Sequence, residues 1–524
     1  MKNLKWLQPA FVVSLIVFNF IFWNENLGLN LFLFTLLLIG GLYLNYKESF
    51  RSLNVKVTVI GTILSSLMVL FFNSTESKIA NILSFTVLVA FVHQSSFRSI
   101  YYAFLHIVTS VVMTPFQLYK RKKEQAKKVP NLYRALRILR MSLVPFLIAF
   151  IFYQLYSYAN PLFSHYASQF FGKIINGISL FFETISLGRI FFIFFGAIIL
   201  SIIYYRNEVA IYLDRDLSHK DKMERIRQYR SRKSQAYSFW TGLPVADSLR
   251  PPFPALALKN QSRRGIILLI MVNVLLLAEN FVDIRWLWFN FQLPAAFSLK
   301  EYVREGTGVL IFSIFLSMAV LLYYFKKNQN FYKDNKWLKQ LALLWIIQNG
   351  VLAYSVFLRN YHYIDFHGLA YKRIGVLVFI CLTIFGLVTM YYKIRKVKSV
   401  YFLVRLNTWA VYVTMIALTF FNWDVQIAKY NLAHWNKGEI DVDFYLALSD
   451  KAMPMVYENL DSVKAQITAH QQNEVKWINY LNFDDFKEAL EQKRSRFVEN
   501  YSEHSWLSYN RADKEAFDKL IALK

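Results

Sequence analysis

Long apolar runs without charged residues recur from one end of the chain to the other, and Lys and Arg bound them. Examples are residues 31–44, 190–205, 265–278, 309–325, 374–392 and 400–421. A helix of about 18 or more apolar residues crosses the roughly 30 Å hydrocarbon layer of a bilayer, and only a helix or a closed barrel satisfies its backbone there. The sequence therefore predicts an all-α polytopic membrane protein.

Composition agrees with this class, because 56% of the residues are hydrophobic and 18% are aromatic. Trp and Tyr gather near the ends of the runs, as in Trp23, Tyr204 and Tyr323, which is typical of aromatic residues at a membrane interface. The single cysteine, Cys381, excludes an intrachain disulfide and cysteine-based metal or redox chemistry. We expect no cofactor.

The net charge of +26 is unevenly distributed. Residues 422–524 hold 13 basic and 17 acidic residues, a net of −4, so the remaining 421 residues carry +30. That excess lies in a few loops between apolar runs, which is typical of the cytoplasmic side of a membrane protein. We therefore expect these loops to contact anionic lipid, and we expect no nucleic-acid partner.

Basic and poorly charged loops alternate along the chain, which predicts about eleven membrane helices, within a range of ten to twelve. The N-terminus is then cytoplasmic and the C-terminal tail extracytoplasmic. Residues 100–118 are ambiguous. If they span the membrane, the loops that precede them lie on the opposite side of the membrane from the side given by the eleven-helix arrangement. In the eleven-helix arrangement they lie along the inner surface.

Six regions follow from this topology. They are N-terminal membrane helices (1–119), a basic cytoplasmic segment (120–140), membrane helices with an outer interfacial helix at 161–182 (141–205), a basic cytoplasmic loop (206–264), C-terminal membrane helices (265–421) and a small helical extracytoplasmic tail (422–524).

Several stretches together resemble a known family. They are LKNQSRRGIILLIMVNVLLLAENFVDIRWLW (258–288), REGTGVLIFSIFLSM (304–318), RNYHYIDFHGLAYKRIGV (359–376), NWDVQIAKYNL (422–432) and EIDVDFYLALSDKAMP (439–454). In order and spacing these are similar to the bacterial membrane family known as domain of unknown function 4173, in the form found in Bacteroidota. The resemblance covers about residues 190–460. It implies a bacterial inner-membrane protein and supplies no reaction, because that family has none assigned.

Mixed charge gathers at the predicted outer ends of the later helices. Side chains of both signs there could bind an anionic or zwitterionic ligand, with Arg pairing to phosphate or carboxylate, or could form ordinary boundary ion pairs. The candidate residues are Glu279, Asp283, Arg285, Glu301, Arg304, Glu305, Arg359, His362, Asp365, His367, Lys372 and Arg373.

Two chemical interpretations of this group are weaker. His362, Asp365 and His367 have ligand chemistry suitable for zinc at a loose spacing, and we predict no metal site. Glu279 or Asp283 near apolar surroundings could act as an acid or base, yet hydrated interfacial carboxylates are the simpler interpretation, so we assign no catalytic residue.

Polar side chains inside the predicted spans are few. Gln348 and Asn349 are the best candidates for lining a solute pathway, and interhelical hydrogen bonding is the alternative. Three function classes remain open: a non-catalytic scaffold, accessory or sensor component of a complex with an unidentified protein partner; a carrier for a small or lipid-like solute; and an enzyme acting on an outer-leaflet substrate. The sequence favours the first and leans away from an enzyme.

Overall fold

The computed structural model describes residues 6–126, 186–206, 210–224, 255–289, 299–435, 441–472 and 482–523, with scattered positions between 145 and 163. Within these residues the regular structure is helical, with one isolated bridge between Lys222 and Lys398. The all-α prediction is therefore confirmed for this part of the chain. Most of the predicted basic segment 120–140, the interfacial helix at 161–182 and residues 225–254 of the basic loop lie outside it.

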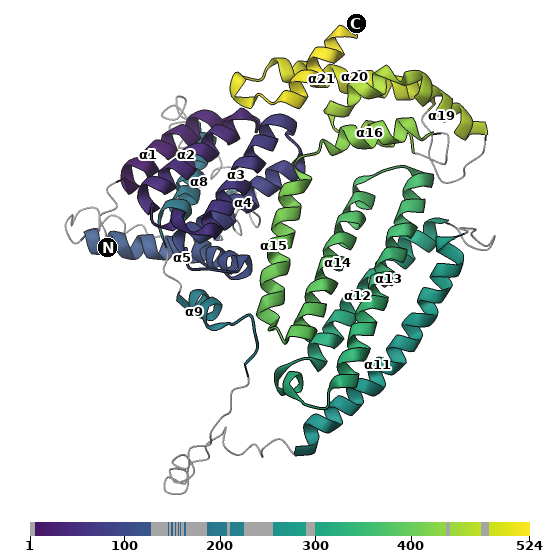
Figure 1. The fold of residues 1–524 in the computed structure, drawn as a ribbon. Helices are drawn as coiled ribbons and strands as arrows, with labels where there is room; N and C mark the ends of the chain where they lie inside the picture. The colour runs from purple at the N-terminus through teal and green to yellow at the C-terminus, as the bar shows by residue number, and fades with distance from the viewer. Residues whose placement is uncertain are drawn as a thin grey trace.

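The N-terminal helices form a first bundle (Figure 1). It consists of α1 (Leu7–Phe22), α2 (Leu29–Tyr46), α3 (Leu53–Phe72), α4 (Thr75–His93) and α8 (Leu187–Tyr204), with η1 (Ser49–Arg51) between α2 and α3. Leu42, Leu88, Phe91 and Tyr204 are fully buried in its core. The helices of this bundle thus pack against one another through part of their apolar surface. Their remaining apolar side chains face outward, as in a membrane bundle.

Helix α5 (Ile100–Ala126) runs across one end of this bundle (Figure 1). It begins beside the end of α4, where the rings of Phe97 and His106 lie 5.5 Å apart. The expectation that residues 100–118 lie along the inner membrane surface stays a prediction. The short helix α9 (Ala210–Ser218) packs against α5 at the same end.

The later helices form a second bundle beside the first (Figure 1). Its members are α11 (Ala255–Asp283), the π-helix η2 (Ile284–Trp288), α12 (Leu299–Tyr324), η3 (Lys327–Phe331), α13 (Lys336–His367), α14 (Tyr371–Lys396) and α15 (Val400–Leu418). Helix α15 packs on α14 and also on α3, α4 and α5, so it joins the two bundles. The Tyr412 hydroxyl on α15 lies 2.7 Å from the Ser84 hydroxyl on α4.

Nine helices in the described part of the chain are long and apolar enough to cross a membrane. They are α2, α3, α4, α8, α11 with η2, the part of α12 from Gly306 onward, α13, α14 and α15. Helix α1 is shorter, with 16 residues. The chain is therefore a multi-pass membrane protein by its structure, and the total of about eleven spans stays a prediction.

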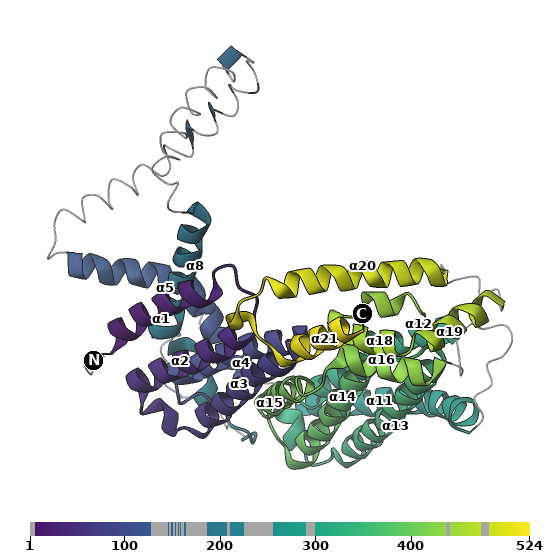
Figure 2. The same cartoon turned by 90° about the horizontal axis from the view of Figure 1, so that it is seen from above.

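The tail lies across the ends of the bundles (Figures 1 and 2). It contains α16 (Trp423–Ala433), α17 (Phe444–Ala447), η5 (Asp450–Ala452), α18 (Met453–Glu458), α19 (Leu460–Gln472), α20 (Phe483–Ser502), η6 (Trp506–Ser508) and α21 (Arg511–Ala522). Its buried residues, including Ile427, Tyr445 and Phe486, form one core with Ile374 of α14. The predicted helical tail is thus docked on the membrane helices rather than separate from them.

Two adjacent glycines in α2 allow a test of the first bundle. A Cβ at Gly41 would overlap the hydroxyl of Tyr204 from α8, whereas a Cβ at Gly40 meets nothing within 4 Å. Alanine normally stabilises a helix relative to glycine by roughly 0.5–1 kcal/mol, but overpacking destabilises by about 1–3 kcal/mol. We expect Gly40→Ala to raise the thermal unfolding midpoint in detergent and Gly41→Ala to lower it. Equal shifts of the same sign would contradict the α2–α8 packing.

Candidate functional site

The predicted outer-face charges converge at Arg359 of α13. Its guanidinium pairs with the carboxylate of Asp283, the last residue of α11, and lies 3.6 Å from Glu279 one turn earlier. The Arg359 and Asp283 side chains are 6% and 1% exposed. A Cβ at Gly306 of α12 would lie 3.2 Å from Arg359, so α12 approaches closely. This ion pair therefore joins α11 to α13 at their tail-side ends, and α12 packs closely beside it.

The π-helix η2 follows Asp283 directly, and such turns shift the side chains that follow them around the helix. The Trp288 indole N–H donates to Ser355 Oγ of α13 at 3.0 Å, and its ring contacts Tyr354 edge-on. The π-turn thus extends the contact between α11 and α13 beyond the ion pair.

His362, Asp365 and His367 follow on α13 without forming a metal site. His362 and Asp365 are half-buried, and the His367 ring lies 4.4 Å from the Tyr363 ring. Nowhere in the described residues do three His, Cys, Asp or Glu side chains gather as metal ligands would.

Arg373 of α14 acts at the turn between α13 and α14. It donates to the carbonyl oxygen of His367 at 2.7 Å and to that of Gly368, which has φ +81°. Asn431 of α16 receives the Leu369 N–H at 2.6 Å and donates to the Leu369 carbonyl at 3.0 Å. Arg373 therefore caps the end of α13, and Asn431 attaches the first tail helix to the same turn.

Two further outer candidates, Arg285 and Lys372, do not join this cluster. Arg285 is exposed, with its guanidinium 6.0 Å from the Trp286 ring centre, and Lys372 is exposed. The side chains of Glu301, Arg304 and Glu305, in the first turns of α12, lie outside the described residues.

Intramembrane amides form a ladder between α11 and α13, which run in the same direction. Asn273 donates to the Leu341 carbonyl at 3.1 Å, and Asn280 donates to the Gln348 carbonyl at 3.2 Å. Asn349 donates to Trp345 within its own helix at 2.7 Å. The backbone of Gln348 thus takes part in interhelical bonding of the kind that holds membrane helices together.

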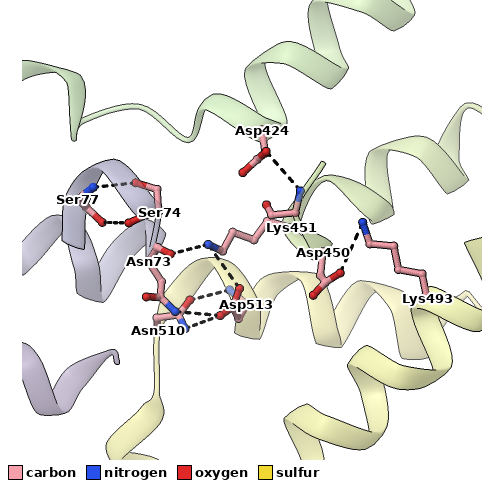
Figure 3. Close-up of polar contacts among 10 residues, drawn as sticks. Asn73, Ser74, Ser77, Asp424, Asp450, Lys451, Lys493, Asn510 and Asp513 are labelled. Atoms are coloured by element: carbon pink, nitrogen blue, oxygen red, sulfur yellow. Dashed lines mark hydrogen bonds and ion pairs between the residues drawn. The ribbon is translucent and has the colours of Figure 1, made fainter. Parts of the chain in front are cut away.

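A polar cluster that sequence reasoning missed joins the tail to the first bundle (Figure 3). We call Asn73, Lys451, Asn510 and Asp513 the tail junction. The Lys451 ammonium donates to the Asn73 carbonyl at 2.9 Å and lies 3.9 Å from Asp513, whose other oxygen accepts from Asn73 at 3.3 Å and Asn510 at 2.6 Å. Asn73 ends α3 with φ +46°, so Lys451 caps that helix from another element.

A second seam lies between the α1–α2 loop and the tail. The Leu29 N–H donates to the Tyr509 carbonyl at 2.8 Å, and the Asn26 N–H donates to Ser508 Oγ at 2.9 Å. A Cβ at Gly28 would overlap the carbonyl oxygens of residues 508 and 509. The backbones of the loop and the tail therefore touch at Gly28.

Beside the tail junction, Lys493 of α20 lies 3.7 Å from Asp450 and donates to the Leu446 carbonyl at 2.9 Å and to that of Leu448 (Figure 3). Burial raises the pKa of Asp450 above its ordinary value although Lys493 is close, and burial lowers the pKa of Lys493. Desolvation therefore outweighs attraction in this pair.

The opposite end of the bundles has matching caps. Fully buried Asp216, near the end of α9, accepts the Arg98 N–H at 2.6 Å and the Tyr401 hydroxyl of α15 at 2.8 Å. Lys393 of α14 donates to the Phe325 carbonyl after α12 at 2.7 Å, and His93 contacts the Ile203 carbonyl of α8 at 2.9 Å. Sequence reasoning predicted none of these pairs, because their members lie 68 to 185 residues apart and no motif links them.

These features define a multi-pass α-helical membrane protein whose tail is fixed to its membrane helices. The family model described as domain of unknown function (DUF4153) matches residues 11–459, and the chain belongs to this family. The more specific resemblance to domain of unknown function 4173 is not shown by that match. No curated protein and no solved structure matches the chain.

Removing Arg359 tests the first cluster. Arg359→Met leaves Asp283 charged and buried, so we expect a loss of about 3 kcal/mol in the free energy of unfolding and a lower thermal midpoint in detergent. The double variant Arg359→Met, Asp283→Leu should recover much of that loss. Arg285→Met is the control, because Arg285 is exposed and lies two residues after Asp283 in the chain. This substitution should change the unfolding midpoint little. An undiminished midpoint for Arg359→Met would contradict a structural role for the pair.

The pKa of Asp450 gives a pH test. Because that pKa is raised in the folded tail, ionised Asp450 lowers stability at pH 7, and this unfavourable contribution disappears as the pH falls through the raised pKa. We expect Asp450→Asn to raise the unfolding midpoint at pH 7 and to leave it unchanged at pH 4. The exposed Glu488→Gln is the matched control. Destabilisation by Asp450→Asn at pH 7 would mean that attraction to Lys493 dominates.

Proposed function

We propose that this chain is a non-catalytic component of a bacterial inner-membrane complex, acting as a scaffold, accessory subunit or sensor. In this proposal its N-terminus is cytoplasmic and its tail is an extracytoplasmic platform for a protein partner. The observation that carries the proposal is the attachment of the tail to both bundles, through Lys451 on one and Asn431 on the other. A platform held at several points presents its outer face in a fixed orientation.

The outer charges support a structural role. Arg359 pairs with Asp283, Arg373 caps α13 and Lys451 caps α3. Each of these cations is engaged with a carboxylate or a helix end of the protein itself. A site that bound a charged substrate through these residues would have to break these bonds first.

The charge distribution supports the orientation. Basic residues gather at the end of the bundles opposite the tail, in the loops near residues 47–56, 205–224, 326–339 and 393–405. An excess of Lys and Arg is typical of cytoplasmic loops. In the proposed topology α1 and one further predicted span within 141–185 join the nine candidate spans to make eleven. An odd number of spans supports a tail on the opposite side of the membrane from the N-terminus.

A carrier is the second candidate, favoured by unpaired oxygens inside the second bundle. The side-chain oxygens of Asn280, Gln348 and Asn349 are buried and accept no hydrogen bond from the described residues. Buried acceptors of this kind usually bond to water or to a ligand. A polar solute that donates hydrogen bonds would fit this need.

The two candidates separate in one experiment. The tagged full-length protein is purified from its native membrane in gentle detergent, and its mass and composition are measured by native mass spectrometry. We expect a protein partner at a fixed ratio. Charge reversal at exposed Lys487 of α20, as Lys487→Glu, should release that partner, and Lys396→Glu, at an exposed lysine on the other end of the bundles, should retain it.

A different result would favour the carrier. A monomer or homodimer that carries a bound solute, lost in Asn349→Leu, would replace the platform proposal by the carrier. Retention of the partner by both lysine variants would place the partner's contact away from α20.

A further inference from the structure

The segment 505–509 of the tail lies where a membrane span begins. The carbonyl of Tyr509 accepts the N–H of Leu29, the first residue of span α2. Trp23, at the end of the neighbouring helix α1, lies on the same loop that the tail contacts. Because Trp and Tyr favour the headgroup layer, we expect exposed aromatic residues at this position to meet lipid headgroups.

A pocket of about 210 Å³ opens at this segment. Tyr501, His504, Trp506, Ser508, Tyr509 and Lys514 line it. Trp506 is 67% exposed and Tyr509 is 41% exposed, although both belong to a segment whose backbone is fixed against the α1–α2 loop. Two large, exposed aromatic side chains therefore lie beside an open pocket.

A positive charge lines the pocket, and a negative charge lies beside it. Lys514 provides the ammonium group, which donates to Asp518 at 2.7 Å, and the neighbouring His504 Nε2 accepts from the Asn26 side-chain amide at 2.6 Å. The Glu25 carboxylate does not line the pocket itself, but it accepts a hydrogen bond from the hydroxyl of the lining residue Ser508 at 2.6 Å. A ligand that carries one positive and one negative group therefore fits better than a simple anion or cation.

We propose that this pocket binds a phosphoethanolamine group, as presented by the headgroup of a phospholipid in the leaflet on the tail side. The ammonium lies against the aromatic faces of Trp506 and Tyr509 and toward Glu25. The phosphate lies toward Lys514 and His504. The proposal depends on the membrane placement of α2 and is independent of any protein partner, so it can fail while the platform proposal stands.

The test is a lipid titration of the delipidated full-length protein in detergent, followed by native mass spectrometry. Phosphatidylethanolamine and phosphatidylglycerol are added separately. We expect Trp506→Ala to weaken phosphatidylethanolamine binding by about fivefold to tenfold, the size of a partly desolvated cation–π contact, and to leave phosphatidylglycerol binding unchanged. Trp337→Ala is the matched control, because Trp337 is 70% exposed at the opposite end of the bundles.

Lys514→Met provides a second variant should Trp506→Ala fail to fold, and it should weaken the same binding. A third titration, with free phosphoethanolamine, distinguishes a lipid headgroup from a soluble ligand. Trp506-dependent binding of the lipid alone assigns the pocket to the bilayer, and equal binding of the free compound assigns it to a soluble phosphoethanolamine. Unchanged phosphatidylethanolamine affinity in both Trp506→Ala and Lys514→Met would overturn the proposal.

Discussion

A helix in a membrane leaves its last carbonyl groups without partners, and how these groups are satisfied shapes the whole structure. Here the partners come from other elements. Lys451 bonds the carbonyl that ends α3, Arg373 the end of α13, and Lys393 the carbonyl after α12. Each cation also meets the negative end of a helix dipole, which adds to the bond. Helix ends therefore serve as joints between segments far apart in sequence.

The tail is the largest consequence of this rule. It caps α3 through Lys451, meets the start of α2 through the Tyr509 carbonyl and holds the α13–α14 turn through Asn431. Because these contacts fall on both bundles, the tail and α15 together fix one bundle against the other. Four of the charges that sequence reasoning offered for ligand binding, Glu279, Asp283, Arg359 and Arg373, form bonds within the protein at these helix ends. The aromatic pocket near Trp506 is a separate feature of the tail.

Much of the fold could be predicted from the sequence, because apolar runs and basic loops report directly on the bilayer. The meeting of Arg359 with Asp283 and Glu279 was expected from their shared place at the ends of helices. The tail junction could not be predicted. Asn510 and Asp513 form an ordinary helix cap that a motif reveals, but its pairing with Asn73 spans 440 residues and depends on tertiary packing.

The most direct test of a fixed tail is cross-linking across its seam with the α1–α2 loop. Cys381 is replaced by Ser, cysteines are placed at Asn26 and His504, whose side chains lie 2.6 Å apart, and a short bis-methanethiosulfonate reagent is added to the full-length protein. A fixed tail predicts fast, near-complete formation of the linked peptide pair by mass spectrometry. A control pair at Asn26 and Lys487, about 25 Å further along α20, should not link. Equal, slow linking of both pairs would show a freely moving tail and contradict the account.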